Sequence, residues 1–282
     1  MFGRLSVFGR LSLFGNPRRA ASPDALRRAV SGKVVVVTGG SEGIGREVAR
    51  QVVGAGARAI LIARNAGRLH ELAAELGPNA HAMPCDLADR AAVAAVTKEI
   101  AETYEHVDVV VSNAGKSIQR RITDSYDRMH DFERLADVNY LGPIALLLGL
   151  LPVMGRGHIV NVSTIGVLLP PAPRWAGYVS SKAAFDVWLR SVAAELADAG
   201  LTTTSVYLAL VHTRMSAPST EFDKVPGLSP AEAAAVVCRG ITDRPLLIAP
   251  WWARAADIVA AVSRRPAHAA LRAYDRRLRR PR

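Results

Sequence analysis

The sequence predicts an α/β fold, in which a single doubly wound domain is built on one seven-stranded parallel sheet of the Rossmann type. Two observations lead to this prediction. Short apolar runs alternate with segments of helical periodicity along most of the chain, as in parallel sheets that are covered by helices on both faces. A glycine-rich turn, residues 38–45, also follows the first apolar run and opens the first helix of the alternation.

Each predicted strand is a short apolar segment. The first, at residues 33–38, contains four consecutive β-branched residues from Val34 to Val37, which favours a strand that is buried on both faces. Six more strands are predicted at residues 59–63, 80–85, 107–112, 157–163, 202–208 and 246–248. The helical pattern predicts helices at residues 43–54, 68–76, 90–103, 131–154, 176–199 and 230–241.

The chain of 282 residues divides into three parts by composition. A basic and apolar arm covers residues 1–32, with a short helix from Ser22 to Val30 that Ser22 would cap. The domain covers residues 33–250, and a basic helical tail, interrupted by Pro266, covers residues 251–282.

The net charge of +11 belongs to the two ends of the chain. Residues 1–33 carry +6 and residues 251–282 carry +7, so the part between them carries −2. Basic ends are compatible with solvated tails or with contact to an anionic lipid surface. A nucleic-acid partner is not expected, because no recognition motif accompanies the charge.

The cysteines and the apolar segments favour a cytoplasmic protein with no more than peripheral membrane contact. Cys85 and Cys238 are far apart and lack the spacing of a disulfide framework or a metal site. No convincing signal peptide is present at the N-terminus. The longest apolar stretch, residues 140–154, contains glycines and prolines and is shorter than a bilayer requires.

The glycine-rich turn has the sequence Thr38-Gly-Gly-Ser-Glu-Gly-Ile-Gly45. Gly39 permits the tight turn, Gly43 lets the backbone approach a pyrophosphate, and Gly45 lets the helix pack closely. The helix N-terminus then presents N–H groups to phosphates. The turn therefore predicts a dinucleotide site.

The end of the second strand favours NADP(H) over NAD. An acidic residue there would bind the ribose 2′-hydroxyl, but the chain has Ala63 followed by Arg64 and Asn65. A guanidinium group can bind a 2′-phosphate. Glu42, inside the glycine-rich turn, argues mildly for NAD.

Four polar residues form the predicted reaction centre: Asn139, Ser163, Tyr178 and Lys182. Tyr178 is the predicted general acid for reduction. Lys182 lies at i+4 on the same helix face, where its cation would favour the phenolate and could hold the nicotinamide ribose. Ser163 would polarise the substrate carbonyl. Asn139 could hold a water that links Lys182 to solvent.

These motifs resemble those of the classical short-chain dehydrogenase/reductase family over residues 33–250. The match rests on the glycine-rich turn, Asp86, the segment 112–115, Asn139, Ser163 and the Tyr178-Val-Ser-Ser-Lys182 motif. Motifs and resemblance together predict these cofactor contacts: Gly39, Ser41, Gly43, Ile44, Gly45, Arg64, Asn65, Asp86, Leu87, Asn113, Ala114, Gly115, Tyr178, Lys182, Val211 and Thr213. The resemblance implies that Asp86 binds the adenine and that Thr213 touches the nicotinamide carboxamide.

The chain departs from the family pattern at the mouth of the site. Ser112 replaces the usual first asparagine of its motif, and Leu208-Ala209 replaces the usual Pro-Gly. The interval from Ser163 to Tyr178 is longer than usual and contains Pro170, Pro171 and Pro173.

A narrower resemblance concerns the substrate. Residues 115–121, 125–133, 210–218 and 228–234 are similar to the reductase domain of bacterial fatty acyl-CoA reductases and to mycolate-type ketoacyl reductases. This implies an NADPH-dependent reductase of a hydrophobic, long-chain ketone or aldehyde. Alternatives are a reductase of a steroid, a polyketide or a small alcohol, and a non-catalytic cofactor-binding or membrane scaffold protein. The apolar helices 131–154 and 176–199 suggest a homo-oligomer, a dimer or a tetramer.

Overall fold

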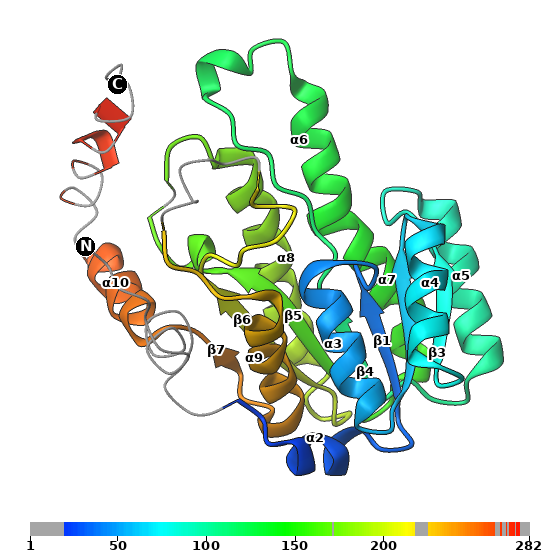
Figure 1. Cartoon of the computed structure of the whole chain (residues 1–282). Coiled ribbons are helices and arrows are strands. Elements are labelled where there is room, and N and C mark those ends of the chain that lie inside the picture. Colours follow the sequence, from blue (N-terminus) through cyan, green and yellow to red (C-terminus); the bar gives the residue numbers. More distant parts are fainter. Residues whose placement is uncertain are drawn as a thin grey trace.

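The protein is described by a computed structural model that covers residues 20–170, 172–217 and 225–262, together with residues 266, 269, 271–273, 275 and 276. In this part of the chain, seven parallel strands form one sheet in the order β3-β2-β1-β4-β5-β6-β7 (Figure 1). This confirms the predicted fold class. The strands are β1 (Val34–Thr38), β2 (Arg58–Ala63), β3 (Ala80–Pro84), β4 (Val109–Ser112), β5 (His158–Thr164), β6 (Thr202–Leu208) and β7 (Leu247–Ile248).

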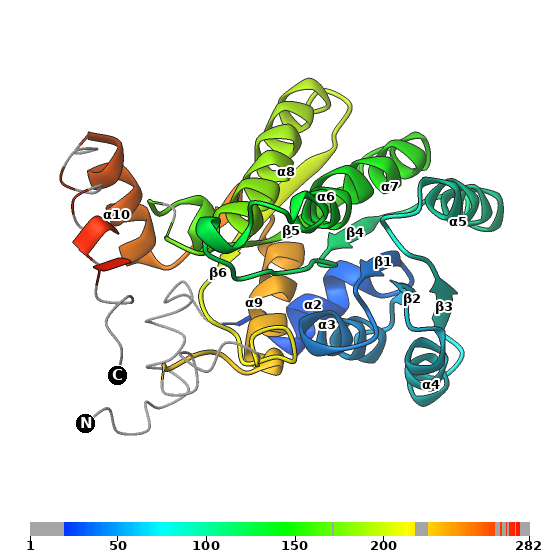
Figure 2. The same ribbon diagram turned by 90° about the horizontal axis from the view of Figure 1, so that it is seen from above.

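Helices cover both faces of the sheet (Figure 2). One face carries α2 (Pro23–Val30), α3 (Gly43–Gly54), α4 (Ala66–Leu76) and α9 (Pro230–Asp243). The other carries α5 (Arg90–Thr103), α6 (Met129–Ala136), α7 (Gly142–Leu150) and α8 (Ala176–Glu195). Alternate residues of β1 point to opposite faces, so Val35 and Val37 belong to one apolar core and Val34 and Val36 to the other.

The strand order changes direction at β1, which lies between β2 and β4. The chain runs outward from β1 to β3, then crosses the sheet to β4 and continues to β7. In open parallel sheets, ligands bind at the carboxyl ends of the strands at this point. The glycine-rich turn after β1 and the segment after β4 meet there.

Element boundaries differ from the predicted ones where a cap or a turn decides them. α4 begins at Ala66 and not at residue 68, because the Asn65 side chain accepts a hydrogen bond of 3.0 Å from the Arg68 N–H and caps the helix. α8 ends at Glu195 and not at residue 199, and Gly200, with φ of 84°, turns the chain toward β6.

The predicted helix at residues 131–154 is a continuous helical run, Met129–Val153, that changes type along its length. A π-helical turn, η2 (Asp137–Leu141), joins α6 to α7, and a 3-10 turn, η3 (Leu151–Val153), follows. We expected the glycine and proline residues to break this apolar stretch. Gly142 and Pro143 instead occupy the start of α7, where a missing proline N–H is tolerated.

This run of 25 residues is therefore long and apolar enough to cross a membrane by length and composition, which corrects the shorter stretch expected above. It is the one such helix among the described residues. A third of its most apolar window is buried inside the fold, and α7 packs against α5 while α6 packs against α8. Length and composition are weak evidence for a span, because a core helix passes the same test.

The two ends of the chain are described in part. Ser22 caps α2 as predicted, since its hydroxyl accepts a hydrogen bond from the Ala25 N–H, and residues 1–19 of the predicted arm lie outside the described residues. The tail begins with α10 (Trp251–Val262), which exposes Trp251 and Ile258. Contact with lipid and self-association stay predictions.

Candidate active site

The glycine-rich turn adopts a conformation that requires its glycines. Gly39 and Gly43 have φ of 66° and 58°, in the left-handed region that glycine tolerates best. A Cβ at Gly45 would collide with the Gly39 carbonyl oxygen and would lie 2.6 Å from Nδ2 of Asn113. Ser41 lies in the turn and Ile44 packs against the core beside α3. The roles predicted for Gly39 and Gly45 thus have a steric basis.

Hydrogen bonds between β1 and the segment after β4 hold the turn in place. The Thr38 hydroxyl accepts hydrogen bonds of 2.9 Å from the N–H groups of both Asn113 and Ala114. Asn113 Nδ2 donates one of 2.9 Å to the Thr38 carbonyl oxygen. Asn113 and Ala114 are predicted cofactor contacts, and these bonds show that they also hold the segment after β4 against the end of β1. The sequence analysis did not predict this role for Thr38. Its position as the one polar residue of β1, at the carboxyl end of the strand, was a signal for it.

The region after β2 and β3 holds the residues predicted to bind the adenosine. Arg64 is 64% exposed, and its guanidinium lies 3.9 Å from the Asp86 carboxylate. Asp86 also accepts a hydrogen bond of 3.0 Å from the Ala88 N–H. Asn65 caps α4, and the Leu87 side chain is buried in the core. Of these four residues, Arg64 and Asp86 are therefore the two whose charged groups are exposed and can contact a ligand.

Glu42 has its charge balanced by arginines. Its carboxylate lies 2.9 Å from the Arg68 guanidinium and 3.6 Å from that of Arg214. Glu42 is the N-cap of α3 but makes no side-chain capping hydrogen bond in the described chain. The first-turn N–H groups of α3 are thus available to an anion.

Asn139 lies in the π-helical turn η2 and is 1% exposed. Its Oδ1 accepts a hydrogen bond of 2.8 Å from the Lys116 N–H. Its Nδ2 donates to the Lys116 carbonyl oxygen at 2.8 Å and to the Ser181 hydroxyl at 2.9 Å. The side chain therefore joins the segment after β4 to α8, a role that the predicted water-holding function did not include. Single π-helical turns often mark functional sites.

Gly115 brings Asn139 and Lys182 to the same place. A Cβ at Gly115 would lie 3.3 Å from both Asn139 Oδ1 and Lys182 Nζ. Lys182 is 6% exposed and donates a hydrogen bond of 3.1 Å to the Val162 carbonyl oxygen of β5. The ammonium group therefore lies at the carboxyl end of the sheet, between α8, β5 and the segment after β4.

Tyr178 lies one turn before Lys182 on α8, and its hydroxyl is hydrogen-bonded to the Thr164 side chain. Its ring also packs edge-on against Trp175, with centroids 5.8 Å apart. The predicted tyrosine therefore meets the last residue of β5.

The structure places Ser163 and its neighbour Thr164 differently with respect to Tyr178. Ile159 and Asn161 of β5 face α8, and Ser163, two residues on, follows the same alternation and is buried. Its hydroxyl makes no hydrogen bond within the described residues. Thr164 is the hydroxyl residue that meets Tyr178. The sequence carried a signal for this, because the interval to Tyr178 is longer than usual when it is counted from Ser163.

The pKa shifts of Tyr178 and Lys182 differ from the expected ones. Burial raises the pKa of Tyr178 to about 12, and the hydrogen bond with Thr164 opposes that shift. We expected the lysine cation to lower this pKa. Burial instead acts on Lys182 too and lowers its pKa to about 8. Loss of hydration disfavours the charged form of each group, so the phenol keeps its proton at neutral pH.

The segment after β6 closes the site next to the glycine-rich turn. Val211 pairs with Leu228, and Thr213 is held by a hydrogen bond of 3.0 Å from its N–H to the Ser216 hydroxyl. A Cβ at Gly43 would lie 3.5 Å from Cγ2 of Thr213. Thr213 is thus beside the backbone that would approach a pyrophosphate.

These residues fit a nicotinamide dinucleotide. The crowded glycines and the uncapped start of α3 suit the phosphates. A second group of residues suits the nicotinamide end of the cofactor, because it supplies a hydroxyl, a phenol and an ammonium group at the end of β5. The group consists of Gly115, Asn139, Thr164, Tyr178 and Lys182. General acid catalysis beside a bound cofactor is the chemistry that this arrangement supports.

Known proteins resemble this chain over most of its length. The model of the short chain dehydrogenase family matches residues 33–224. A fatty acyl-CoA reductase of Acinetobacter baylyi is 42% identical over 244 residues, covering 84% of this chain and 82% of that protein. A fatty acyl-CoA reductase of Mycobacterium tuberculosis is 37% identical over 227 residues, covering 78% of this chain and 77% of that protein.

A solved structure agrees in fold. The 3-ketoacyl-(acyl-carrier-protein) reductase of Brucella melitensis, complexed with NADH, superposes with a TM-score of 0.69 at 24% identity, covering 76% of this chain and 92% of that chain. At this identity the likeness concerns the fold. The family match and the two reductase relatives carry the assignment: the chain is an oxidoreductase that belongs to the short-chain dehydrogenase/reductase family.

Proposed function

We propose that the protein reduces a long-chain, acyl-derived carbonyl compound with NADPH. The observation that carries the chemistry is the meeting of Tyr178 with Thr164 at the end of β5, one helical turn from Lys182. The acyl substrate is supported by the two relatives that are fatty acyl-CoA reductases.

In this proposal, the residues of the chain hold the carbonyl group and supply the proton. When bound, the reduced nicotinamide supplies the hydride for the carbonyl carbon. Thr164 donates a hydrogen bond to the carbonyl oxygen and polarises it. Tyr178 gives its proton to the same oxygen, which its raised pKa permits because the phenol is protonated at neutral pH. An aldehyde or ketone becomes the alcohol in this step, whereas a thioester becomes a hemithioacetal, whose C–S bond then breaks to release the aldehyde and the free thiol.

Lys182 and Asn139 support that proton transfer. With a pKa of about 8, Lys182 is mostly an ammonium at neutral pH, and it stabilises the phenolate that Tyr178 leaves behind. Asn139 fixes the backbone of Lys116 against α8, so that Gly115 and Lys182 keep their distance. It acts by positioning other groups.

NADPH is favoured by the charges after β2. Arg64 is exposed directly after Ala63, which occupies the position where an acidic residue would select NAD. Glu42, the residue that argues for NAD, is paired with Arg68 at 2.9 Å, which compensates its charge. A 2′-phosphate would therefore meet the guanidinium group of Arg64 and no uncompensated charge from Glu42.

The reaction is tested by the variant Tyr178→Phe with hexadecanal and palmitoyl-CoA as substrates. We expect turnover to fall by a factor of about 10²–10⁴, because a positioned general acid contributes that much. NADPH binding, followed by nicotinamide fluorescence, should be unchanged. The control is Tyr126→Phe, at a tyrosine that is 82% exposed. Near-normal turnover of Tyr178→Phe would reject the mechanism, and equal rates with short and long chains would reject the acyl substrate.

The cofactor preference is tested by Arg64→Ala. We expect KM for NADPH to rise about tenfold or more and KM for NADH to stay constant, since a hydrogen bond to a charged group contributes about 1.5–3 kcal/mol. Lys98→Ala, at an exposed site on α5, is the control. If wild-type protein prefers NADH, the assignment of NADPH is wrong.

A further inference from the structure

A cavity of about 930 Å³ has Gly177, the residue before Tyr178, in its lining. Its walls come from the segment 118–125, from α6, from the segment between β5 and α8, from the first turn of α8 and from four residues of the tail, Leu271, Arg272, Asp275 and Arg276. Apolar side chains form much of the surface: Ile118, Ile122, Phe132, Leu135 and Leu271. The volume lies at the upper end of the range for small-molecule sites, which is roughly 300–1,000 Å³.

Gly177 connects the cavity to the catalytic tyrosine. It lines the cavity, and a Cβ at this position would lie 2.9 Å from Leu135 Cδ1 and 3.2 Å from Phe132 Cδ1. α6 and α8 therefore approach closely here. Tyr178 is the next residue of α8, so the cavity adjoins the turn that carries the proton donor.

Basic groups dominate the charge of the cavity wall. The wall contains five arginines and two aspartates, which gives a net charge of +3. The arginines are Arg120, Arg121, Arg174, Arg272 and Arg276. An apolar chamber with such a wall suits a ligand that has both a hydrocarbon part and an anionic part.

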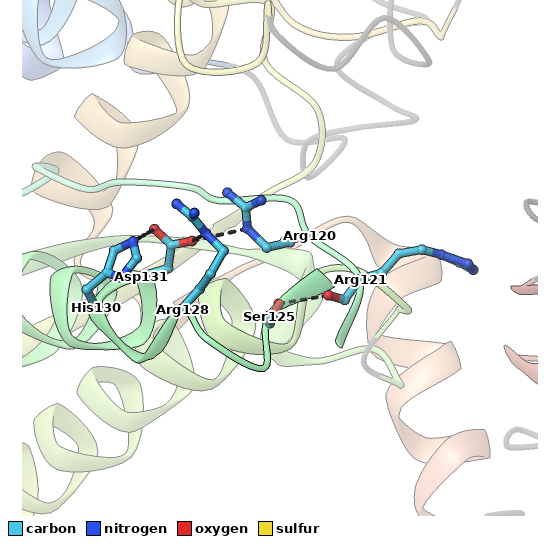
Figure 3. A network of polar contacts seen from close by, with 6 residues as sticks. All are labelled: Arg120, Arg121, Ser125, Arg128, His130 and Asp131. Carbon is cyan, nitrogen blue, oxygen red and sulfur yellow. Dashed lines mark hydrogen bonds and ion pairs between the residues drawn. The ribbon is translucent and has the colours of Figure 1, made fainter. Parts of the chain in front are cut away.

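Both aspartates are already paired. Figure 3 shows Asp131, which is 6% exposed, between Arg120 and Arg128, whose Nε atoms lie 3.1 Å and 2.9 Å from its Oδ2. His130 Nε2 lies 3.5 Å from Oδ1 of the same carboxylate. The hydrogen bond from Arg128 lowers the pKa of Asp131, as do the nearby charges of Arg120 and His130. Asp131 therefore stays ionised and holds Arg120 at the cavity.

The second ion pair holds the tail against the cavity. Arg121 and Asp275 are 154 residues apart, and their charged atoms lie 2.6 Å from each other. Their side chains are 23% and 19% exposed, so water screens this pair less than a surface pair. The Ser125 hydroxyl donates to the Arg121 carbonyl oxygen at 2.7 Å, which fixes the turn that presents Arg121. Leu271, Arg272, Asp275 and Arg276 thus form a wall of the cavity.

We propose that this cavity binds an acyl thioester whose carrier bears a phosphate ester. The hydrocarbon chain lies along Phe132, Leu135 and Leu271, and the phosphate meets Arg272 and Arg276. The inference rests on the proposed function, because it places the acyl chain of that substrate. Guanidinium groups suit phosphate oxygens through paired hydrogen bonds. Coenzyme A and the phosphopantetheine arm of an acyl carrier protein share this chemistry.

The phosphate part is tested with three palmitoyl thioesters, those of coenzyme A, acyl carrier protein and N-acetylcysteamine. The last has the same chain and thioester but no phosphate. We expect its KM to exceed that of the better phosphorylated ester about tenfold or more. The double variant Arg272→Gln/Arg276→Gln should raise KM for that phosphorylated ester about tenfold and leave the N-acetylcysteamine ester unchanged. The phosphorylated ester that responds identifies the carrier.

The site is overturned if the double variant changes KM by the same factor for all three thioesters, or if it changes KM for none of them. The control Lys98→Gln lies on α5 and should change none of them. If no palmitoyl compound is turned over, the proposed function fails by itself. Calorimetry with palmitoyl-CoA then still tests the cavity, because the double variant must weaken its binding about tenfold.

The tail wall is tested by charge exchange. Arg121→Asp should raise KM for palmitoyl-CoA by repelling Asp275, and Arg121→Asp with Asp275→Arg should restore it. Leu271→Asp should raise KM for palmitoyl-CoA much more than for butyryl-CoA, because each buried methylene contributes about fourfold. Circular dichroism and NADPH binding verify the fold of each variant. The tail does not form a wall of the cavity if the double exchange leaves KM for palmitoyl-CoA as high as in Arg121→Asp. The same conclusion follows if Leu271→Asp leaves the chain-length preference unchanged.

Discussion

Helix α8 carries two different kinds of buried polar group on one face, and they lie one helical turn apart. Near its start, Tyr178 and Lys182 are bonded to β5 through Thr164 and the Val162 carbonyl oxygen, and burial shifts the pKa of both toward the neutral form. One turn further, Asp186 is 1% exposed. Its Oδ1 accepts hydrogen bonds from three side chains, Asn161, Ser205 and Tyr207.

This difference between the start and the middle of α8 indicates two purposes, with Tyr178 and Lys182 placed for the proposed reaction and Asp186 placed for stability. In the proposed reaction Tyr178 gives up its proton beside Lys182, and the buried environment of both groups opposes a permanent charge. Asp186 has several partners at once, including Arg190, whose Nε lies 3.3 Å from its Oδ2. Burial with several partners locks the middle of α8 onto β5 and β6. That lock holds the start of the helix where the reaction occurs.

The same contrast holds along β5. Its first residue, His158, is fully buried and lies 2.8 Å from the Thr202 hydroxyl, 3.0 Å from the Gly240 carbonyl oxygen and 3.2 Å from the Thr204 hydroxyl. Its last residue, Thr164, is half-buried and meets Tyr178. The start of β5 is therefore held by the hydrogen bonds of His158, and its end contributes Thr164 to the candidate active site.

The largest effect is expected from Asp186→Ala. The buried hydroxyls of Ser205 and Tyr207 would each lose a charged acceptor, so the free energy of unfolding should fall by about 4 kcal/mol. Urea unfolding measures this change. Asp198→Ala, at an exposed aspartate just beyond α8, should change stability by less than about 0.5 kcal/mol. A similarly small loss for Asp186→Ala would mean that the network does not hold the helix.

A pH-dependent loss of stability is expected from His158. Burial lowers its pKa from 6.5 to about 4, helped by the charge of Arg244. As the pH falls, the unfolded state binds the proton first. The stability that His158 permits is fully present above pH 6.5 and is lost as the pH falls to about 4, a loss of about 3 kcal/mol.

The measurement is the free energy of unfolding of the wild type and of His158→Gln across that pH range. Glutamine does not titrate, so the variant should lack this part of the pH dependence while it keeps the part that comes from carboxylates. Parallel curves for the two proteins would show that His158 does not titrate as we predict.

The smallest of the three effects separates Thr164 from Ser163. Thr164→Ala should lower kcat about 100-fold, since loss of one donor to the developing oxyanion costs that much. Ser163→Ala should stay within about threefold of the wild type, because the buried Ser163 hydroxyl makes no hydrogen bond within the described residues. Thr164→Ser should recover most of the rate. A greater loss in Ser163→Ala than in Thr164→Ala would return the role to Ser163.

Local patterns in the sequence determined the fold and half of the site. Four consecutive valines predict β1, the glycine spacing predicts the turn after it, and the interval of four residues places Tyr178 and Lys182 on one helix face. These features depend on backbone sterics and helical periodicity, which act over a few residues. The sequence therefore predicts them without knowledge of the remaining chain.

The tertiary structure decided the rest. The direction of a side chain at a strand end depends on where the chain leaves the sheet, so adjacent hydroxyls at Ser163 and Thr164 could not be told apart beforehand. Contacts between distant segments, such as Arg121 with Asp275 or Asn139 with Ser181, leave no local pattern. Burial sets the pKa of Tyr178 and Lys182. Each of these results from packing, which brings together groups that the sequence keeps apart.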